Sequence, residues 1–327
     1  MPRHIGFEDA RRAVLTRELL DRNRWGDRDV RRALANGTLI RLHRNCYVLE
    51  ADWADLWPES RHRVEVAAAF GEMRGGGGVA CRESSAVLWE LPLHRHVPRA
   101  VHVTLPGGKH VSSRTGLRRH LEALPADDVT ERHGIRTTTL DRTVFDLARS
   151  VGLETAVAAA DAALRQVAFR DRAYDEDASE DWRERMRVRV ARAKGKRGVR
   201  QAATVVEMAD GRAESPAESV ARVLLHGLGF ERVRLQVPVA GPLGQEYRVD
   251  AEIEEARTFL EVDGIGKYED EALRSGRTLQ QVLLDEKRRE DWIRGTTQQR
   301  FVRVEDKHLL TAQSLAERLT AFGIRLP

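Results

Sequence analysis

Two carboxylates and a lysine stand close together in the stretch LEVDGIGKYED, residues 260–270. Its leucine and valine are good strand formers, and Glu261 and Asp263 alternate with them. Because successive side chains of a strand point to opposite faces, the two acids are expected to share one face. Lys267 follows just after two glycines. The pattern therefore predicts a strand that carries acids on one face and ends beside a cation.

Two further acids are expected near this strand. Asp250 lies near the end of the preceding strand and converges on Glu261 if the two strands pair as a hairpin. Glu218 lies in the first turn of a helix before the strands, where negative charge is tolerated. Carboxylates held together repel and raise one another's pKa, and a hard divalent cation removes that cost. We therefore predict a site for Mg²⁺, with Mn²⁺ as an alternative, in which Asp250, Glu261 and Asp263 are ligands, Glu218 completes the cluster, and Lys267 stabilises charge at a phosphate.

A helix, three strands, a second helix and a fourth strand are expected to hold these residues. Ser215 suits the cap of the leading helix, and Pro216 suits its first position. The remaining elements are predicted in VRLQVPVA, QEYRVDAEIEE, ARTFLEVDG, LLDEKRREDWIRG and QRFVRVED.

The C-terminal segment, over roughly residues 213–320, resembles the PD-(D/E)xK nuclease superfamily and, within it, the very-short-patch-repair-like endonuclease domain. The resemblance is carried by Glu218 in the leading helix, Asp250 in RVD, the EVDG run, Lys267-Tyr268 and the EKRRED helix. It implies a restriction-endonuclease-like mixed sheet flanked by helices, which hydrolyses DNA phosphodiesters. By resemblance, Asp250 and Glu261 are the metal ligands, and Glu218 and Asp263 assist.

The chain departs from the superfamily at one position of this motif. A lysine usually stands two residues after the strand acid, and here that position is Asp263. Two hypotheses follow, in which either Lys267 or Lys287 supplies the cation from a shifted position.

The first 57 residues predict three helices and a hairpin. Thr16 suits the cap of the second helix, and the third begins near Asp27 and ends at Asn36-Gly37. TLIRLHRNCYVL predicts two alternating strands. This order is that of a winged helix-turn-helix, in which the third helix enters a major groove and the hairpin is the wing. Five arginines would then meet the DNA: Arg28, Arg31, Arg32, Arg41 and Arg44. The alternative is a solvated arginine-rich face.

The stretch LTRELLDRNRWGDRDVRRALANGTLIRLHRNCYVL resembles the N-terminal winged helix of AbiEi-type antitoxins of abortive-infection toxin–antitoxin systems. The stretches ESSAVLWELPL and TTTLDRTVFDLAR resemble the domain that follows it in those proteins. The resemblance implies operator binding, transcriptional autorepression and neutralisation of a nucleotidyltransferase toxin. Winged helices often bind palindromes as dimers, so a homodimer is compatible with this prediction.

Composition indicates a protein of the cytoplasm. The chain has 327 residues, so two or three domains are expected, and its net charge of +4 says only that acidic partners are tolerated or attracted. Cys46 and Cys81 match no metal-ligand spacing and indicate a reducing compartment, with both thiols buried or idle. No apolar signal sequence or membrane-spanning segment is expected. The histidines of the middle region, His102 among them, also match no metal-ligand spacing and are expected at the surface or facing a groove.

The sequence predicts a multidomain α+β/α/β protein. Its four segments are a winged helix-turn-helix (1–57), a mixed α+β AbiEi-like domain (58–168), a charged helical linker (169–212) and a nuclease-like domain (213–327). The main hypothesis is a DNA-binding protein with a metal-dependent endonuclease domain that acts on double-stranded DNA. The alternative is a non-enzymatic repressor or antitoxin with a degenerate nuclease fold. A third hypothesis is an enzyme that acts only at mismatched, modified or branched DNA.

Overall fold

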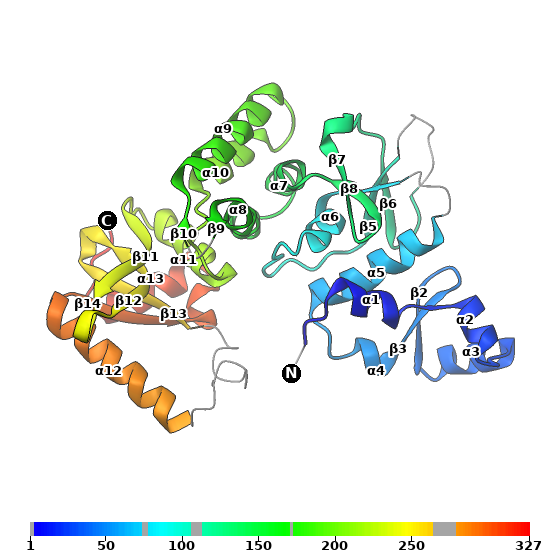
Figure 1. Cartoon of the computed structure of the whole chain (residues 1–327), viewed down its shortest axis with the longest axis horizontal. Coiled ribbons are helices and arrows are strands. Elements are labelled where there is room, and N and C mark those ends of the chain that lie inside the picture. Colours follow the sequence, from blue (N-terminus) through cyan, green and yellow to red (C-terminus); the bar gives the residue numbers. More distant parts are fainter. Residues whose placement is uncertain (1–2, 74–77, 106–112, 171–172, 264–278) are drawn as a thin grey trace. The chain divides into compact units, whose positions relative to one another are not determined.

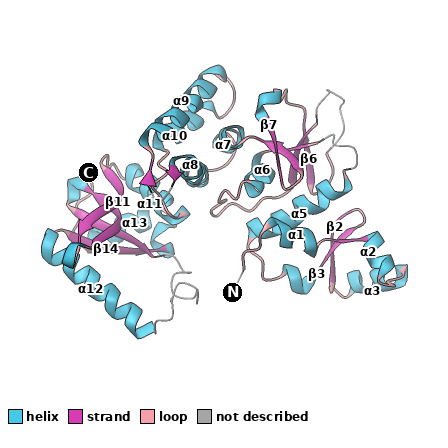
Figure 2. Ribbon diagram, in the orientation of Figure 1, coloured by secondary structure: helices cyan, strands magenta, loops and turns pink. Residues whose placement is uncertain are grey.

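The computed structural model describes residues 3–73, 78–105, 113–170, 173–263 and 279–327. It divides into two units, which are described separately. The first comprises Met1–Gly152 and Met186–Ala203, and the second comprises Leu153–Arg185 and Thr204–Pro327. Both units combine helices with sheets (Figures 1 and 2). The predicted mixed α/β, multidomain architecture is therefore confirmed, and the division into four segments stays a prediction.

The N-terminal part of the first unit contains short helices and a three-stranded antiparallel sheet with the order β1-β3-β2. Its elements are α1 (Phe7–Ala13), β1 (Leu15–Thr16), α2 (Arg17–Arg22), α3 (Asp27–Ala35), β2 (Leu39–His43), β3 (Cys46–Leu49) and α4 (Glu50–Trp53). The hydroxyl of Thr16 accepts a hydrogen bond from the Leu19 amide, which confirms the predicted cap. Asn45 adopts a positive φ of 59° in the turn between β2 and β3, a conformation that asparagine tolerates.

A five-stranded mixed sheet with the order β6-β5-β4-β8-β7 forms the rest of the first unit's core. Its elements are α5 (Pro58–Glu72), β4 (Val79–Ala80), α6 (Arg82–Leu88), β5 (Val101–Thr104), β6 (Leu117–His120), β7 (Val129–Arg132), β8 (Ile135–Thr138) and α7 (Leu140–Ala148). Helix α6 contacts α5, α7, β5 and β8. Every residue from Glu83 to Leu88 is buried, because α6 has neighbours on several sides.

The second unit is built around a four-stranded sheet with the order β11-β12-β13-β14. The elements from α8 onward are α8 (Leu153–Ala168), β9 (Phe169–Arg170), β10 (Ala173–Tyr174), α9 (Glu176–Arg192), α10 (Val199–Met208), α11 (Pro216–Gly227), β11 (Val233–Ala240), β12 (Glu246–Ile253), β13 (Thr258–Asp263), α12 (Leu279–Thr297), β14 (Arg300–Glu305) and α13 (Ala312–Ala321). Helices α9 and α10 contribute residues to both units. The first three strands pair antiparallel, and β13 and β14 pair parallel. The predicted order of helix, three strands, helix and strand is confirmed.

The two faces of this sheet carry separate apolar clusters. Leu260 and Val262 pack in a cluster with residues of α11 and α13. Phe259 packs with Ile293 of α12 and Phe301 of β14 in the other cluster. The side chains of β13 therefore alternate between the faces as predicted, and Glu261 lies on the α12 side.

Two further features of the fold concern membrane-spanning helices and the cysteines. Within the described part of the chain, no helix is long and apolar enough to cross a membrane. Cys46 and Cys81 are free and buried. Burial raises the pKa of Cys46 to about 11 and that of Cys81 to about 12, so both thiols stay protonated and unreactive at neutral pH.

Candidate functional site

Asp250 and Glu261 lie on adjacent antiparallel strands and are both buried, at 8% and 5% exposed. The strands pair with Ala251 opposite Leu260, which places the two acids at the next position of the same register. Asp250 Oδ2 accepts a hydrogen bond of 2.8 Å from the Val262 amide. The convergence expected from a hairpin is therefore present, and Asp250 is fixed by the backbone of the strand that carries Glu261.

Glu218 stands at the first turn of α11, which begins at the predicted cap Ser215 and at Pro216. Ser215 Oγ donates to Glu218 Oε1 at 2.9 Å, and Gln236 Nε2 donates to Oε2 at 3.0 Å. Burial raises the pKa of Glu218 above its usual range, and the charge of Asp250 adds to this shift. Glu218 is therefore held beside the same acidic centre.

Glu261 carries the largest pKa shift of this centre. Burial, followed by the charge of Asp250, raises the pKa of Glu261 to about 7, although Arg289 opposes the shift. Arg289 of α12 donates to Glu261 Oε1 at 2.5 Å. Among the described residues, the cation that contacts Glu261 is therefore Arg289, and neither Lys267 nor Lys287 is seen in that role.

The other predicted residues of this centre are placed differently. Asp263 pairs with Arg303 of β14 at 3.2 Å, and Arg303 also pairs with Glu286 at 3.1 Å and Glu290 at 3.0 Å. Lys267 lies outside the described residues. Lys287 is exposed on α12 and pairs with no described carboxylate. The structure thus brings Asp250, Glu261 and Glu218 together and engages Asp263 in a separate ion-pair network.

The donor chemistry of the Asp250–Glu261 pair fits a hard divalent cation. Both side chains offer carboxylate oxygens, and Mg²⁺ is commonly bound through one or two carboxylates while it keeps several waters. Burial, and next the charge of Asp250, raise the pKa of Glu261, so its ionised form is costly here, and a bound cation would reduce that cost. Among the residues that the structure describes, no three His, Cys, Asp or Glu side chains are grouped closely enough to hold a metal ion.

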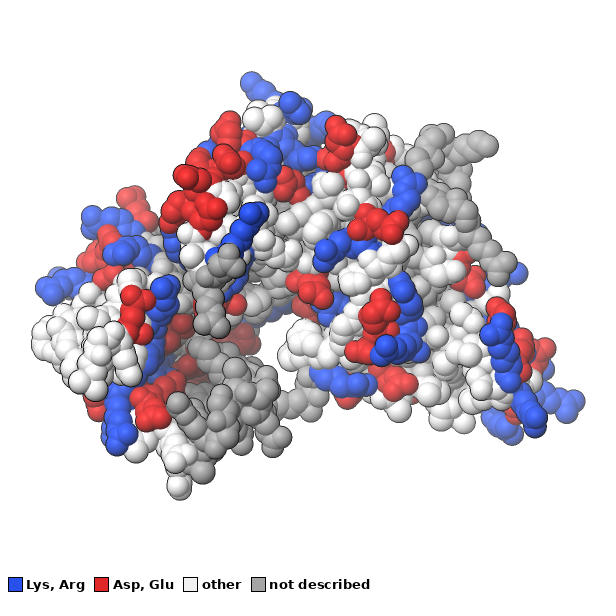
Figure 3. Space-filling view, in the orientation of Figure 1, with Lys and Arg blue, Asp and Glu red and all other residues white. Residues whose placement is uncertain are grey.

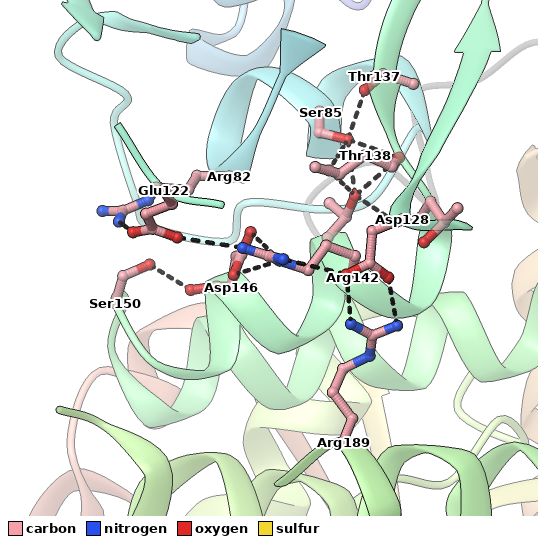
Figure 4. Close-up of polar contacts among 12 residues, drawn as sticks. Arg82, Ser85, Glu122, Asp128, Thr137, Thr138, Arg142, Asp146, Ser150 and Arg189 are labelled. Atoms are coloured by element: carbon pink, nitrogen blue, oxygen red, sulfur yellow. Dashed lines mark hydrogen bonds and ion pairs between the residues drawn. The ribbon is translucent and has the colours of Figure 1, made fainter. Parts of the chain in front are cut away.

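A second polar cluster lies in the first unit around Arg142 of α7 (Figure 4). Its guanidinium binds Asp146 at 3.0 Å, Asp128 at 3.1 Å and Glu122 at 3.1 Å. Arg189 of α9 closes the cluster with two hydrogen bonds to Asp128, of 2.6 and 3.0 Å. A group of buried hydroxyls adjoins it, in which Ser85, Thr137, Thr138 and Thr143 are 2.7–2.9 Å apart. The cluster joins α7, α9 and the segment before β7 by paired charges.

The middle-region histidines were expected at the surface or facing a groove, and for His102 a surface position is wrong. His102 is 8% exposed, since every residue of β5 is buried. Its Nδ1 lies 3.0 Å from His120 Nε2 and 3.7 Å from Glu83 Oε2. Burial is the main reason that the pKa of His102 is lowered to about 4, and the charge of Glu83 opposes this shift. Alternation could not reveal this burial, because both faces of β5 are covered.

The five predicted DNA-contacting arginines are all exposed. They lie on α3 and on β2 with the turn after it: Arg28, Arg31, Arg32, Arg41 and Arg44. Arg32 pairs with Asp29 at 2.8 Å. Arg28 and Arg44 have no ion-pair partner within the described part of the chain. Figure 3 shows lysine and arginine side chains beside acidic ones on the surface over α2 and α3. Acidic residues therefore interrupt this basic surface.

Comparison with known proteins places the chain among relatives. Residues 79–207 match the family model described as the AbiEi antitoxin C-terminal domain. Two proteins of Mycobacterium tuberculosis, uncharacterized protein MT2308 of strain CDC 1551 / Oshkosh and uncharacterized protein Rv2248 of strain ATCC 25618 / H37Rv, are each 30% identical to it over 237 residues. The aligned region is 70% of this chain and 75% of each relative. The chain belongs to the family of these mycobacterial proteins.

In the present chain, the segment that matches the AbiEi model runs from β4 into α10. It contains the Arg142 cluster and His102, and it ends before Glu218, Asp250 and Glu261. The match therefore supports the antitoxin hypothesis more than the endonuclease hypothesis, which rests on the acids alone.

Several residues of these sites were not anticipated. Arg289 was part of the EKRRED helix, but nothing in the sequence showed which of its cations would face Glu261. Gln236 gave no signal, because it reaches Glu218 through an unusual backbone conformation, with a φ of 51° inside β11. Arg142 and Arg189 meet Asp128 across 14 and 61 residues of sequence, which no local pattern predicts.

Proposed function

We propose that the chain is a DNA-binding regulator of the antitoxin type that acts in the cytoplasm. The observation that carries this proposal is the match of residues 79–207 to the AbiEi antitoxin C-terminal domain, together with the exposed arginines that precede it. The arrangement of α2, α3, β2 and β3 supports a winged helix-turn-helix whose recognition helix is α3. A nucleotidyltransferase toxin is the partner that this proposal implies.

Binding to duplex DNA from the chain's own promoter tests this function. Replacement of Arg28, Arg31 and Arg44 by alanine is expected to weaken binding and to flatten its salt dependence, because each lost phosphate contact changes the slope of log K against log salt by about 0.9. The matched control is Arg118→Ala, an exposed arginine on β6. Fluorescence anisotropy across a salt series measures both quantities. Equal salt slopes for the parent and the triple variant would place the DNA surface elsewhere.

Suppression of toxicity tests the antitoxin part of the proposal. The chain is expressed together with a nucleotidyltransferase encoded beside its gene, and growth is compared with and without the chain. Restored growth that survives the triple arginine substitution would assign neutralisation to a surface other than the DNA-binding one. Growth arrest that the chain does not relieve would leave only DNA binding.

A second candidate function is metal-dependent hydrolysis of DNA phosphodiesters by a nuclease-like C-terminal domain. The buried, opposed pair Asp250–Glu261 favours it, with Glu218 beside them. A divalent cation held by Asp250 and Glu261 would neutralise phosphate charge and lower the pKa of a bound water. Arg289 fixes the orientation of Glu261, and Lys267 is the proposed cation at the phosphate.

Incubation with supercoiled, linear and single-stranded DNA, with Mg²⁺, Mn²⁺ or EDTA, tests this second function. Metal-dependent nicking by the parent and its loss in Asp250→Ala and Glu261→Ala, with duplex binding retained, is the expected result. Equal cleavage by these variants and the parent would remove the two acids from the mechanism. No cleavage of any substrate, with duplex binding intact, would leave the antitoxin-type function alone.

A further inference from the structure

The second unit contains an open cavity of about 770 Å³ beside the edge strand of its sheet. One wall comes from the end of α8, from β9 and β10, and from residues 210–214, and the other comes from β11 and β12. Its lining residues include four arginines, two aromatic rings and two carboxylates: Arg165, Arg212, Arg234, Arg248, Phe169, Tyr174, Asp210 and Glu214. Arginines outnumber carboxylates in the lining, and the other ion-pair partners of these arginines lie outside it: Glu176, Glu246, Glu252 and Glu254. The guanidinium groups at the cavity surface therefore favour an anionic ligand.

Two arginine–aromatic pairs form one wall of this cavity. The guanidinium carbon of Arg165 lies 4.2 Å from the ring centroid of Phe169, and that of Arg212 lies 4.3 Å from the ring centroid of Tyr174. Glu214 pairs with Arg165 at 3.1 Å, and Asp210 pairs with Arg212 at 3.2 Å. Stacked planes that are already fixed can receive a flat group at little conformational cost.

The opposite wall offers charge that is more open to solvent. The side chains of Arg234 on β11 and Arg248 on β12 are 58% and 60% exposed. Arg234 approaches its acidic partners at only 3.6 Å, a distance at which exposed ion pairs are weak. Arg248 pairs with Glu246 at 3.0 Å, but both of these side chains are more than half exposed, so solvent weakens this pair as well. These two arginines can therefore turn toward phosphates at small cost.

Gln236 links the cavity to the acidic centre. It lines the cavity and donates to Glu218 at 3.0 Å. Its neighbours on β11 pair with the neighbours of Asp250 on β12, so Gln236 lies across from Asp250. Its positive φ of 51° is unusual for a non-glycine residue, and such strain is common where a side chain is held for function. A linear ligand bound in the cavity would thus pass beside the carboxylates of Glu218 and Asp250.

We infer that this cavity binds a single-stranded nucleic acid. Aromatic and guanidinium planes stack on bases, and bases present their faces only where the strand is unpaired. Arginines along the opposite wall suit the phosphates of such a strand. A small inorganic anion would use the arginines and leave the rings without a role. The site is distinct from the N-terminal arginines proposed for duplex DNA, and the binding does not require hydrolysis.

Anisotropy of a fluorescent single-stranded oligonucleotide of about 12 nucleotides, with the full chain in EDTA, tests the inference. Phe169→Ala and Tyr174→Ala are each expected to weaken binding at least about 5-fold, because stacking on one ring contributes about 1–3 kcal/mol. The matched control is Phe322→Ala, which removes an exposed ring that also lies under an arginine, Arg318 at 4.5 Å, but that does not line the cavity.

Charge variants and photocrosslinking give two further readouts. Arg234→Gln and Arg248→Gln are expected to reduce the slope of log K against log salt by about 0.7 for each lost phosphate contact with a single strand. The control Arg232→Gln removes an exposed arginine just before β11 and should leave the slope unchanged. A 5-bromouridine oligonucleotide should crosslink to the peptides that carry Phe169 and Tyr174.

The outcomes separate this inference from the proposed functions. Duplex binding by each variant reports on the N-terminal surface and shows that the protein is folded. Weaker single-strand binding in the cavity variants, with duplex binding intact, supports the inference even if the chain cuts no DNA. Single-strand binding that is lost only when Arg28, Arg31 and Arg44 are replaced would overturn it. Crosslinks confined to the first unit would overturn it as well.

Discussion

Replacement of Glu261 by glutamine is expected to stabilise the second unit increasingly as pH rises. Burial, and next the charge of Asp250, raise the pKa of Glu261 to about 7 from an ordinary 4.5. The folded state therefore binds more protons than the unfolded state between these pH values, and stability falls as pH rises through that window. Because one pKa unit corresponds to ~1.4 kcal/mol, ionisation of Glu261 costs roughly 1 kcal/mol at pH 5 and roughly 3 kcal/mol at pH 8.

Glutamine removes this cost and keeps an oxygen that can accept from Arg289. The favourable effect of Arg289 on the ionised carboxylate is already contained in the net pKa shift. Arg289 is 21% exposed, so water can compensate part of its lost ion pair. The gain in stability over the parent should therefore approach about 3 kcal/mol at pH 8 and fall to about 1 kcal/mol at pH 5.

Hydrogen exchange of peptides from β12 and β13, measured in EDTA between pH 5 and pH 8 and corrected for intrinsic rates, gives the opening free energy of this region. The matched control is Glu305→Gln on β14, a carboxylate whose pKa is lowered, chiefly by a hydrogen bond from Lys307. That control should show no gain as pH rises. A gain for Glu261→Gln that is equal at pH 5 and pH 8, or a loss at pH 8, would refute the reasoning.

Three further measurements probe the sites separately. Lowering the pH from about 6.5 toward 4 should destabilise the first unit. Burial lowers the pKa of His102 to about 4, so the unfolded state binds more protons than the folded state in this window. Thermal melts should show a smaller loss of stability for His102→Asn than for the parent. Arg142→Leu should cost about 3–5 kcal/mol in urea unfolding, because it leaves its three carboxylates without their shared partner. Replacement of Arg136 by leucine should cost far less, because Arg136 is the exposed residue of the otherwise buried strand β8. Millimolar Mg²⁺ should slow hydrogen exchange in β12 and β13 of the parent and leave Asp250→Ala unchanged, and an equal response of both would exclude a cation at this pair.

Local patterns were sufficient for the elements and for one contact of the acidic centre. Strand alternation and a short hairpin connection together determine that Asp250 faces Glu261, and a serine followed by a proline marks the start of α11. The cation was not predictable in the same way. Arg289 lies 28 residues beyond Glu261, on a helix whose rotation about its axis depends on packing against the sheet. Three neighbouring cations in EKRRED carry equal sequence signals, and only the fold selects one.

A buried ion pair connects the AbiEi-matching segment to the helix that carries Glu218. Arg222 of α11 binds Asp161 of α8 at 2.8 Å, and the two side chains are 5% and 1% exposed. A fragment that begins at residue 213, the predicted start of the nuclease-like domain, would leave the guanidinium of Arg222 without this partner. Loss of one member of a buried pair typically costs about 3–5 kcal/mol.

That cost is a large part of the about 5–15 kcal/mol that stabilises a typical domain. The fragment 213–327 is therefore expected to be largely unfolded by circular dichroism, whereas 153–327 should fold. Arg222→Leu should rescue the shorter fragment in part, because it removes the unpaired charge. A shorter fragment as stable as the longer one would show that the sheet and its acids form an independent module. Otherwise the segment that matches the antitoxin model is also part of the scaffold that holds Glu218, Asp250 and Glu261 in place.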